Sequence, residues 1–285
     1  MTPLFHNSTT KVIDDFLSRP SHALLVVGPT GSGKGLTAQY IASKLLDVEP
    51  EKIAEHPYVQ WLHDQDKGIA IEQIRAAQTF MQLKVPGKAA FRRALIIEQG
   101  ETMSTEAQNA FLKLLEEPPT DSAIILTITS LDQVLPTIRS RAQVLQILPP
   151  TLAQATEYFK EQGSETSVTR AYHLSEGYPG LMHALLNKDS EHPLVAQIDI
   201  AKTLLAGTAY DRLAKVDELS KQKNIPLLLQ AMERVCHAAL TQAVSSSNPN
   251  SKRWAARLRA VVDAQRQATM HVQSKLLLTN LMLAL

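Results

Sequence analysis

Short apolar runs alternate with amphipathic segments through the first half of the chain. Residues 23–27 read Ala-Leu-Leu-Val-Val, an unbroken apolar run of the kind found in strands buried on both faces of a parallel sheet. Strands that alternate with helices predict an α/β fold with a doubly wound parallel sheet. The pattern indicates strands at 23–27, 56–62, 93–98, 123–129 and 143–148, and helices at 7–18, 36–46, 71–83 and 105–116.

The pattern changes after Pro149 and Pro150. Beyond them no segment resembles a strand, and helical spacing continues toward the end of the sequence, with a polar loop at 245–250. We therefore expect three domains, which are an α/β domain at 1–149, a small helical domain at 150–189 and a helical bundle at 190–285.

The composition is that of a globular protein. Of the 285 residues, 44% are hydrophobic and 20% are charged, and the formal net charge is +1. Because the net charge is small, no long-range field favours nucleic acid or a membrane surface, and any DNA contact must be local. No apolar run approaches the ~18 residues needed to cross a bilayer, and the sequence does not start with a signal-peptide pattern. We therefore expect a cytoplasmic protein with no membrane partner.

Cys236 is the only cysteine in the chain. A single cysteine excludes an internal disulfide and a cysteine-rich zinc site, and the nine histidines show no ligand-like spacing. The sequence therefore predicts no metal site and no zinc, and Cys236 is interpreted as a small core residue.

A phosphate-binding loop follows the first strand. It matches the pattern G-x-x-x-x-G-K-[ST] except at the last position, where glycine replaces the hydroxyl residue. In this motif backbone N–H groups hold phosphates, the lysine reaches the β and γ phosphates, and the hydroxyl binds Mg²⁺. We therefore expect a nucleotide site without its metal ligand, formed by Gly28, Pro29, Thr30, Gly31, Ser32, Gly33, Lys34 and Gly35.

A hydrolytic site of this kind also needs acidic residues at the end of a neighbouring strand, one beside the metal and one that orients water. The third strand ends in Glu98 and Gln99. Glu98 stands at the metal position, but Gln99 carries an amide in place of a basic carboxylate. Loss of a general base lowers a rate by typically 10²–10⁴-fold. The sequence therefore predicts a degenerate site with little or no hydrolysis.

Four segments closely resemble the clamp-loader family of AAA+ ATPases. They are N-A-F-L-K-L-L-E-E-P-P at 109–119, H-A-L at 22–24, I-E-Q-I-R at 71–75 and P-T-I-R-S-R at 136–141. The resemblance covers most of residues 20–148, and within the family the chain looks most like the delta-prime subunits of bacterial DNA polymerase III. It implies that the small helical domain is a lid and that the C-terminal bundle is a collar through which subunits associate.

The resemblance also implies roles for single residues. Arg141 matches the arginine of the S-R-C motif, which reaches into the ATP site of a neighbouring subunit, although Ala142 replaces the cysteine. Thr127 or Thr129 matches the polar sensor-1 residue.

Two features that are usual in the family are missing from the sequence. No arginine stands near Gly180, where motor subunits carry the sensor-2 arginine. Residues 47–55 are too short to hold the four-cysteine zinc module of many bacterial members.

The resemblance thus implies a subunit that helps to load the sliding clamp onto primed DNA and supplies Arg141 in trans. ATP or ADP would be bound weakly or as a structural ligand, and little intrinsic ATPase is expected. The expected partners are the delta and gamma/tau subunits of a hetero-oligomeric ring, the sliding clamp, and primer–template DNA reached through the complex. An ATP-hydrolysing motor subunit of the same loader is the alternative. An unrelated P-loop kinase is disfavoured because no basic substrate lid follows the third strand.

A basic cluster lies in one helical segment near the end of the sequence. It consists of Lys252, Arg253, Arg257, Arg259 and Arg266. Such a cluster is typical of a solvated helix face, and contact with DNA or another subunit is the alternative interpretation.

Overall fold

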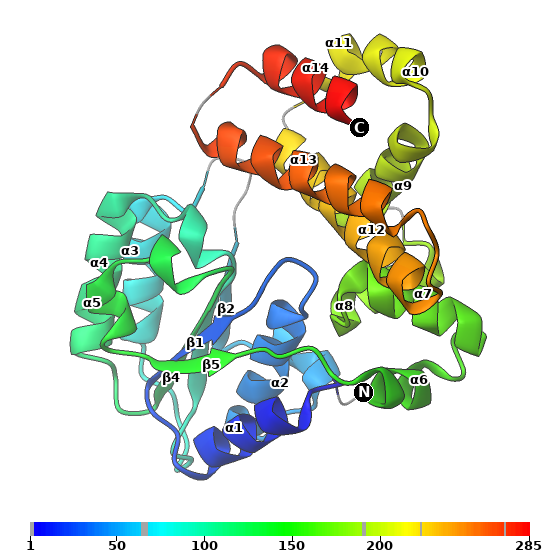
Figure 1. The fold of residues 1–285 in the computed structure, drawn as a ribbon. Coiled ribbons are helices and arrows are strands. Elements are labelled where there is room, and N and C mark those ends of the chain that lie inside the picture. Colours follow the sequence, from blue (N-terminus) through cyan, green and yellow to red (C-terminus); the bar gives the residue numbers. More distant parts are fainter. Residues whose placement is uncertain (1–2, 64–67, 190–191, 223, 271) are drawn as a thin grey trace. The chain divides into compact units, whose positions relative to one another are not determined.

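The computed structural model describes residues 3–63, 68–189, 192–222, 224–270 and 272–285. The chain divides into two compact units, Met1–Pro150 and Thr151–Leu285. The first unit is α/β, and every regular element described in the second is helical (Figure 1).

A five-stranded parallel sheet organises the first unit, with strand order β2-β3-β4-β1-β5. The predicted doubly wound parallel sheet is thereby confirmed. The strands are β1 (Ala23–Val27), β2 (Val59–Leu62), β3 (Arg93–Ile97), β4 (Ser122–Ile128) and β5 (Gln143–Gln146). The helices are α1 (Asn7–Ser18), α2 (Lys34–Leu46), α3 (Ile71–Met81), α4 (Thr105–Glu116) and α5 (Pro136–Arg139), with short 3₁₀ turns η1 (Pro50–Glu55), η2 (Gly100–Thr102) and η3 (Leu131–Gln133).

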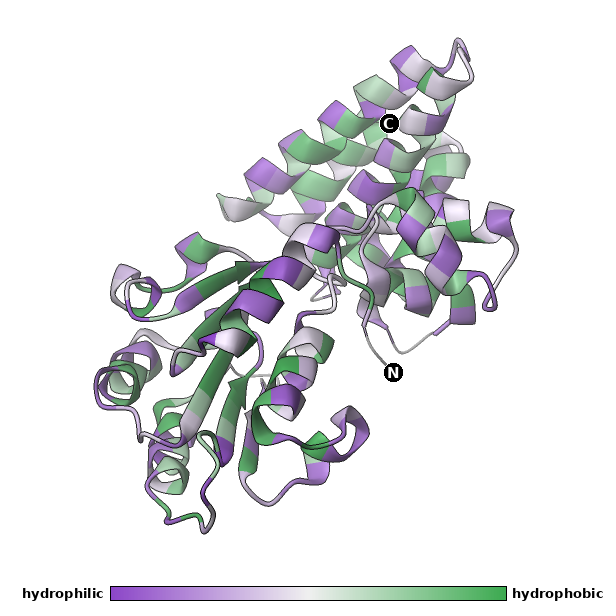
Figure 2. Ribbon diagram, turned by 90° about the horizontal axis from the view of Figure 1, so that it is seen from below, coloured by the Kyte–Doolittle hydropathy of each residue, from purple (hydrophilic) through white to green (hydrophobic). Residues whose placement is uncertain are grey.

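Helices cover both faces of this sheet, which explains why its central strands are buried and mostly apolar. In β1, Leu25 packs with the core under α3 and α4, whereas Leu24 and Val26 pack with the core under α1 and α2. Successive strand residues point to opposite faces, so a strand covered on both sides has few positions that suit a polar side chain. Figure 2 shows the hydrophobic strands between helices whose outward faces are polar.

Two strands are shorter than their apolar runs predict. β2 begins at Val59 because Pro57 has no N–H to donate to a ladder, and the residues before it form a turn. β5 ends at Gln146, although the Ile147 N–H still donates to the Val27 carbonyl at 2.8 Å.

The second unit is built around α12 (Ile225–Ser245). One apolar core joins α12 to helices from both predicted helical domains, and the fully buried Arg234 on α12 donates to the Ser175 carbonyl at 2.8 Å and pairs with Glu176 at 3.3 Å. The division of this unit into a lid and a collar stays a prediction. Its other helices are α6 (Leu152–Phe159), α7 (Glu165–Ser175), α8 (Pro179–Asn187), α9 (Pro193–Ala206), α10 (Ala209–Ala214), α11 (Val216–Leu219), α13 (Ser251–Thr269) and α14 (Ser274–Ala284).

Candidate functional site: a phosphate-binding loop without its metal ligand

The glycine-rich loop runs from the end of β1 to the start of α2. Gly31 and Gly33 both have φ of +85°, a left-handed conformation that favours glycine. Gly33 is the N-cap of α2 and provides no side-chain oxygen to bond the first amides of the helix. Those amides and the helix dipole therefore remain available to an anion.

Ser32 supports the same interpretation. Its side chain is buried, and its Oγ has no hydrogen-bond partner among the residues that the structure describes. A buried hydroxyl without a partner is uncommon, and a phosphate oxygen is a group that would satisfy it. The shape of the loop and this hydroxyl fit the phosphates of a nucleotide.

Lys34 is folded back onto the loop. Its Nζ donates to the carbonyl of Gly28 at 2.7 Å and to that of Pro29 at 3.2 Å. Burial lowers the pKa of Lys34, and the carboxylates of Glu101 and Glu98 act against that shift. The ammonium thus lies beside two negative charges, which weakens the attraction of this loop for a phosphate.

Glu98 lies where a side chain at position 35 would begin. A Cβ added to Gly35 would stand 2.5 Å from Oε1 of Glu98. Burial raises the pKa of Glu98, and the charges of His63 and Lys34 oppose this effect. The hydroxyl that would bind Mg²⁺ is therefore absent, and a carboxylate fills the space that its side chain would occupy.

Gln99 and the two sensor-1 candidates lie at the ends of adjacent strands. The backbone N–H of Gln99, which has a φ of +53°, donates to Oγ1 of the buried Thr127 at 3.2 Å. The hydroxyl of Thr129 hydrogen-bonds the side chains of Glu101 and Gln133. Thr127 thus fixes the backbone at the end of β3, while Thr129 contacts a carboxylate that is electrostatically coupled to Lys34.

Glu101 is the acidic residue that the sequence pattern did not single out. Its Oε2 is buried without a hydrogen-bond partner among the described residues, and its charge is the strongest influence that raises the pKa of Lys34. The turn η2 brings it to the site, because the left-handed Gln99 reverses the chain directly after β3. An acid three residues beyond the strand end was the signal in the sequence, but its approach depends on that turn.

Arg141 lies away from this loop, on the turn that follows α5. Its side chain is 37% exposed, pairs with Oε1 of Glu116 at 2.8 Å and donates to the Thr137 carbonyl at 3.1 Å. Every hydrogen bond that Arg141 makes remains within residues 116–141. The structure therefore brings together the loop 28–35, Glu98 and Glu101, and leaves Arg141 outside this group.

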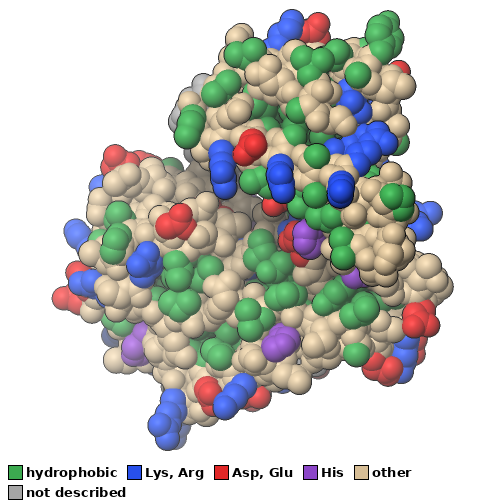
Figure 3. All heavy atoms as spheres, viewed as in Figure 1, with side chains coloured by type: hydrophobic (Ala, Val, Ile, Leu, Met, Phe, Trp, Pro, Cys, Tyr) green, Lys and Arg blue, Asp and Glu red, His purple; other side chains and the backbone are tan. Residues whose placement is uncertain are grey.

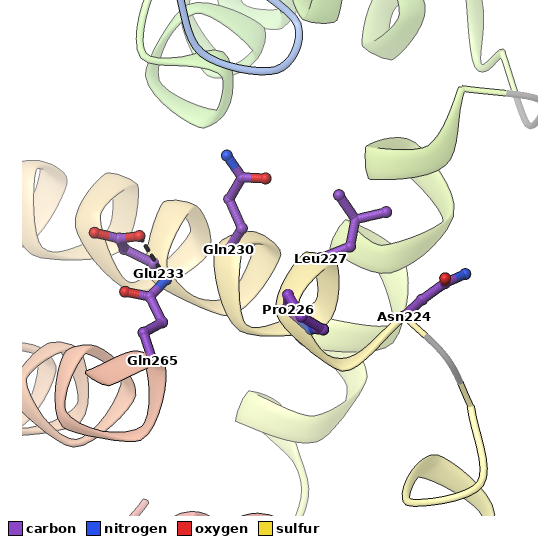
Figure 4. Close-up of a pocket in the computed structure, with 6 residues that line it drawn as sticks. All are labelled: Asn224, Pro226, Leu227, Gln230, Glu233 and Gln265. Carbon is purple, nitrogen blue, oxygen red and sulfur yellow. Dashed lines mark hydrogen bonds between the residues drawn. The ribbon is translucent and has the colours of Figure 1, made fainter. Parts of the chain in front are cut away.

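Two hollows lie outside this site, and one of them, of about 490 Å³ in the first unit, is lined by Arg92, Arg93 and Asp121, whose carboxylate pairs with both arginines. No group of three or more His, Cys, Asp or Glu side chains among the described residues is placed to hold a metal ion. The other hollow, of about 440 Å³ in the second unit, is lined by Gln230, Glu233, Gln265 and their neighbours (Figure 4). Glu233, the only ionisable group in its lining, is hydrogen-bonded by Gln265 at 2.8 Å, so the hollow lacks a pair of groups for acid–base chemistry.

None of the helices that the structure describes is long and apolar enough to span a bilayer.

Residues 14–151 match the sequence model of a family described as "DNA polymerase III, delta subunit". Nearly the whole first unit of this chain is therefore similar to that family. The match ends one residue beyond the unit and includes the loop 28–35, Glu98, the two threonines and Arg141. The resemblance to the clamp-loader family is thereby confirmed.

Curated relatives carry the names of two clamp-loader subunits. The chain is 31% identical over 155 residues to DNA polymerase III subunit delta′ of Pseudomonas aeruginosa, which covers 48% of this chain and 46% of that protein. It is 29% identical over 154 residues to DNA polymerase III subunit gamma/tau of Mycobacterium tuberculosis, which covers 48% of this chain and 26% of that protein. The chain thus spans about half the length of the delta′ relative, and these names describe those proteins.

A solved structure extends the likeness to the second unit at the level of fold. The crystal structure of a DNA polymerase III gamma subunit-related protein from Thermotoga maritima superposes with a TM-score of 0.58 over 96% of this chain and 97% of that one. The sequence identity is 20%, so the likeness concerns architecture alone.

Proposed function

We propose that this chain is a delta-prime-like subunit of a bacterial DNA polymerase III clamp loader, which helps to load the sliding clamp onto primed DNA. The family match and the delta′ relative support this class of subunit. The proposed partners are the delta and gamma/tau subunits of a hetero-oligomeric ring, the sliding clamp, and primer–template DNA held by the complex.

The single observation that carries the finer assignment is the carboxylate of Glu98 against Gly35. A motor subunit needs a hydroxyl at that position to bind Mg²⁺ and a second acid to orient water, and this chain has Gly35 and Gln99 instead. The phosphate-binding part of the loop fits a nucleotide, whereas the metal-binding part does not. We infer that ATP or ADP is held weakly by the loop amides, Ser32 and Lys34, and is hydrolysed poorly or not at all.

Arg141 is the proposed contribution of this subunit to catalysis. A guanidinium carries a permanent charge and a planar set of donors that fits phosphate oxygens. Its side chain is partly exposed and forms its hydrogen bonds with residues other than those of the loop 28–35. Both observations support a role in trans, at the ATP site of a neighbouring subunit. Its pair with Glu116 is a surface pair, which contributes no more than about 1 kcal/mol and can be exchanged for a phosphate.

The test is the DNA- and clamp-stimulated ATPase of the reconstituted loader that contains Arg141→Ala. In GTPases an arginine supplied in trans raises the rate roughly 10³–10⁵-fold at the one site that it serves. The ATPase rate of the complex should therefore fall by the fraction that this site contributes to the total. The matched control is Arg139→Ala, which removes the same side chain two residues earlier from a position that is also exposed. Arg141→Lys keeps the charge without the planar donors and should be partly functional.

Two results would contradict the proposal. If the Arg141→Ala complex assembles and hydrolyses ATP at the unmodified rate, Arg141 is no arginine finger. If the isolated chain turns over ATP near ~1 s⁻¹, the low end of ordinary enzymes, and Lys34→Ala abolishes that activity, the chain is a motor subunit.

A further inference from the structure

The helix α13 concentrates positive charge that the rest of the chain lacks. It carries five basic residues and one acidic residue, Asp263, whereas the formal net charge of the whole chain is only +1. The structure separates these cations into two kinds that the sequence could not distinguish.

Arg257 is a structural residue. It is 5% exposed, its Nε donates to the carbonyl of Leu285 at 3.0 Å, and its Nη1 donates to that of Leu205 at 3.0 Å. Its guanidinium also lies 5.0 Å from the ring centroid of Trp254. These contacts fix Arg257 inside the second unit, so it is not available to a partner.

The other four cations are exposed and form what we call the α13 stripe: Lys252, Arg253, Arg259 and Arg266. Lys252, Arg259 and Arg266 are seven residues apart, which places them on one side of the helix at intervals of about 10.5 Å, over roughly 21 Å in all. Figure 3 shows a row of Lys and Arg side chains along α13. None of the four forms an ion pair with a residue that the structure describes.

We propose that the α13 stripe binds the phosphate backbone of duplex DNA. Duplex DNA carries one negative charge per about 1.7 Å of axis with both strands counted, so a 21 Å length carries about twelve phosphates, of which the stripe faces a part. The long flexible stems of lysine and arginine let their charged ends reach phosphates without base contacts, and such binding is independent of sequence. The small net charge of the chain leaves the stripe as a local source of this attraction.

The composition of the exposed face favours duplex DNA over the two other acidic partners. Single-strand binding surfaces add aromatic side chains on which bases stack, and the only aromatic residue of α13, Trp254, is half-buried and occupied by Arg257. Protein interfaces place large apolar and aromatic anchors at their centre, whereas the exposed positions between these cations are Ala256 and Asp263, neither of which is such an anchor. The proposal concerns a contact of this chain itself and does not depend on Arg141.

The test is the salt dependence of duplex binding by the isolated full chain, measured by fluorescence anisotropy with a labelled duplex of arbitrary sequence. Three phosphate contacts predict a slope of about −2.7 for log K against log salt concentration. Between 25 and 100 mM salt the affinity of the unmodified chain should therefore fall about 40-fold more than that of a variant without these contacts. That variant is Lys252→Gln/Arg259→Gln/Arg266→Gln.

The control variant removes the same charge elsewhere. Lys11→Gln/Arg75→Gln/Lys88→Gln changes three exposed cations of the first unit and should keep the steep slope. The proposal is overturned if the stripe variant and the unmodified chain show the same slope, or if the unmodified chain does not bind the duplex at 25 mM salt. It is also overturned if a single strand of equal length binds more tightly, or if the stripe variant loses affinity only for other loader subunits.

Discussion

Returning the missing hydroxyl to the loop should not by itself return a metal site. The perturbation is Gly35→Ser, which completes the phosphate-binding motif in sequence. The new Cβ would stand 2.5 Å from Oε1 and 3.5 Å from Cδ of Glu98, so the carboxylate must retreat by about 1 Å to reach an ordinary contact distance. Because Glu98 is half-buried beside Lys34, we expect it to remain close and to occupy the space that Mg²⁺ needs.

The energetic consequence for the fold is small. An off-rotamer Glu98 costs of order 0.5–1.5 kcal/mol, and replacing glycine by serine in the first turn of α2 returns about 0.5 kcal/mol. The free energy of unfolding of Gly35→Ser should therefore lie within about 1 kcal/mol of that of the unmodified chain. Its hydrolysis should stay at background, because Gln99 still lacks the carboxylate whose loss lowers rates by typically 10²–10⁴-fold.

Calorimetric titration with ATP, in Mg²⁺ and in EDTA, separates the hydroxyl from the obstruction. Gly35→Ser should bind ATP no more tightly in Mg²⁺ than in EDTA. Gly35→Ser/Glu98→Asp shortens the carboxylate by one methylene and should gain a Mg²⁺ dependence, while Gly35→Ala and Glu98→Asp alone should not. If Gly35→Ser alone binds ATP tightly in Mg²⁺ and loses that binding in EDTA, Glu98 is no obstacle and the reasoning is wrong.

Two further predictions concern buried ionisable groups. Burial raises the pKa of Asp121, but its hydrogen bonds with Arg93 and the charges of Arg93 and Arg92 outweigh that effect and hold the pKa below its ordinary value. Asp121→Asn should therefore lower the free energy of unfolding by about 3 kcal/mol at neutral pH, since it strands the buried Arg93. A depressed pKa stabilises above the unfolded value of about 3.9 and loses its effect as the pH falls through the folded-state pKa. The difference between the two proteins in urea unfolding should therefore shrink below about pH 4, and exposed Asp14→Asn should show neither effect. Burial also raises the pKa of Cys236 to about 12, so only about one thiol in 10⁴ is a thiolate at pH 8, and thiol reagents should label it only on unfolding. Rapid labelling of the native protein would contradict this.

The sheet followed from the apolar runs because its physical cause is local. A strand covered by helices on both faces is apolar at most positions, so the runs at 23–27 and 94–97 stand out against amphipathic neighbours. The ends of strands were less predictable, since they depend on which backbone groups find a partner. Pro57 shortens β2 from within its apolar run for that reason.

The candidate site was predictable as a motif but not as an arrangement. The sequence located the loop, Lys34 and the absent hydroxyl, because glycine spacing is a property of one segment. The approach of Glu98 to Gly35 is a property of three segments, since β3 reaches β1 only through β4. Glu101 arrives through a left-handed residue, Gln99, that no pattern of apolar positions specifies.

The two kinds of cation on α13 illustrate a signal that was present in the sequence and incomplete. Arg257 lies four residues before Val261 and seven before Ala264, both buried, so helical spacing assigns it to the inner face. Spacing alone could not supply the carbonyls that make a buried guanidinium tolerable, because they come from residues 205 and 285. The exposed stripe can be recognised only once the structure shows that Arg257, unlike the other four cations of the basic cluster, is buried.

The bonds of Lys34 explain how a phosphate-binding loop can persist without its metal chemistry. In a loop that holds a nucleotide, phosphates neutralise the lysine and satisfy the loop amides. In this chain the ammonium also donates to the carbonyls of the consecutive residues Gly28 and Pro29, and the carboxylates of Glu98 and Glu101 raise its pKa against the effect of burial. The lysine therefore satisfies two backbone carbonyl groups of the loop, and the two carboxylates balance its charge. These hydrogen bonds give Lys34 a structural role in the turn that does not depend on hydrolysis, whereas none of the described contacts of the turn involves a hydroxyl at position 35. The hydrogen bonds of Lys34 thus explain why the lysine is present although residue 35 carries no hydroxyl.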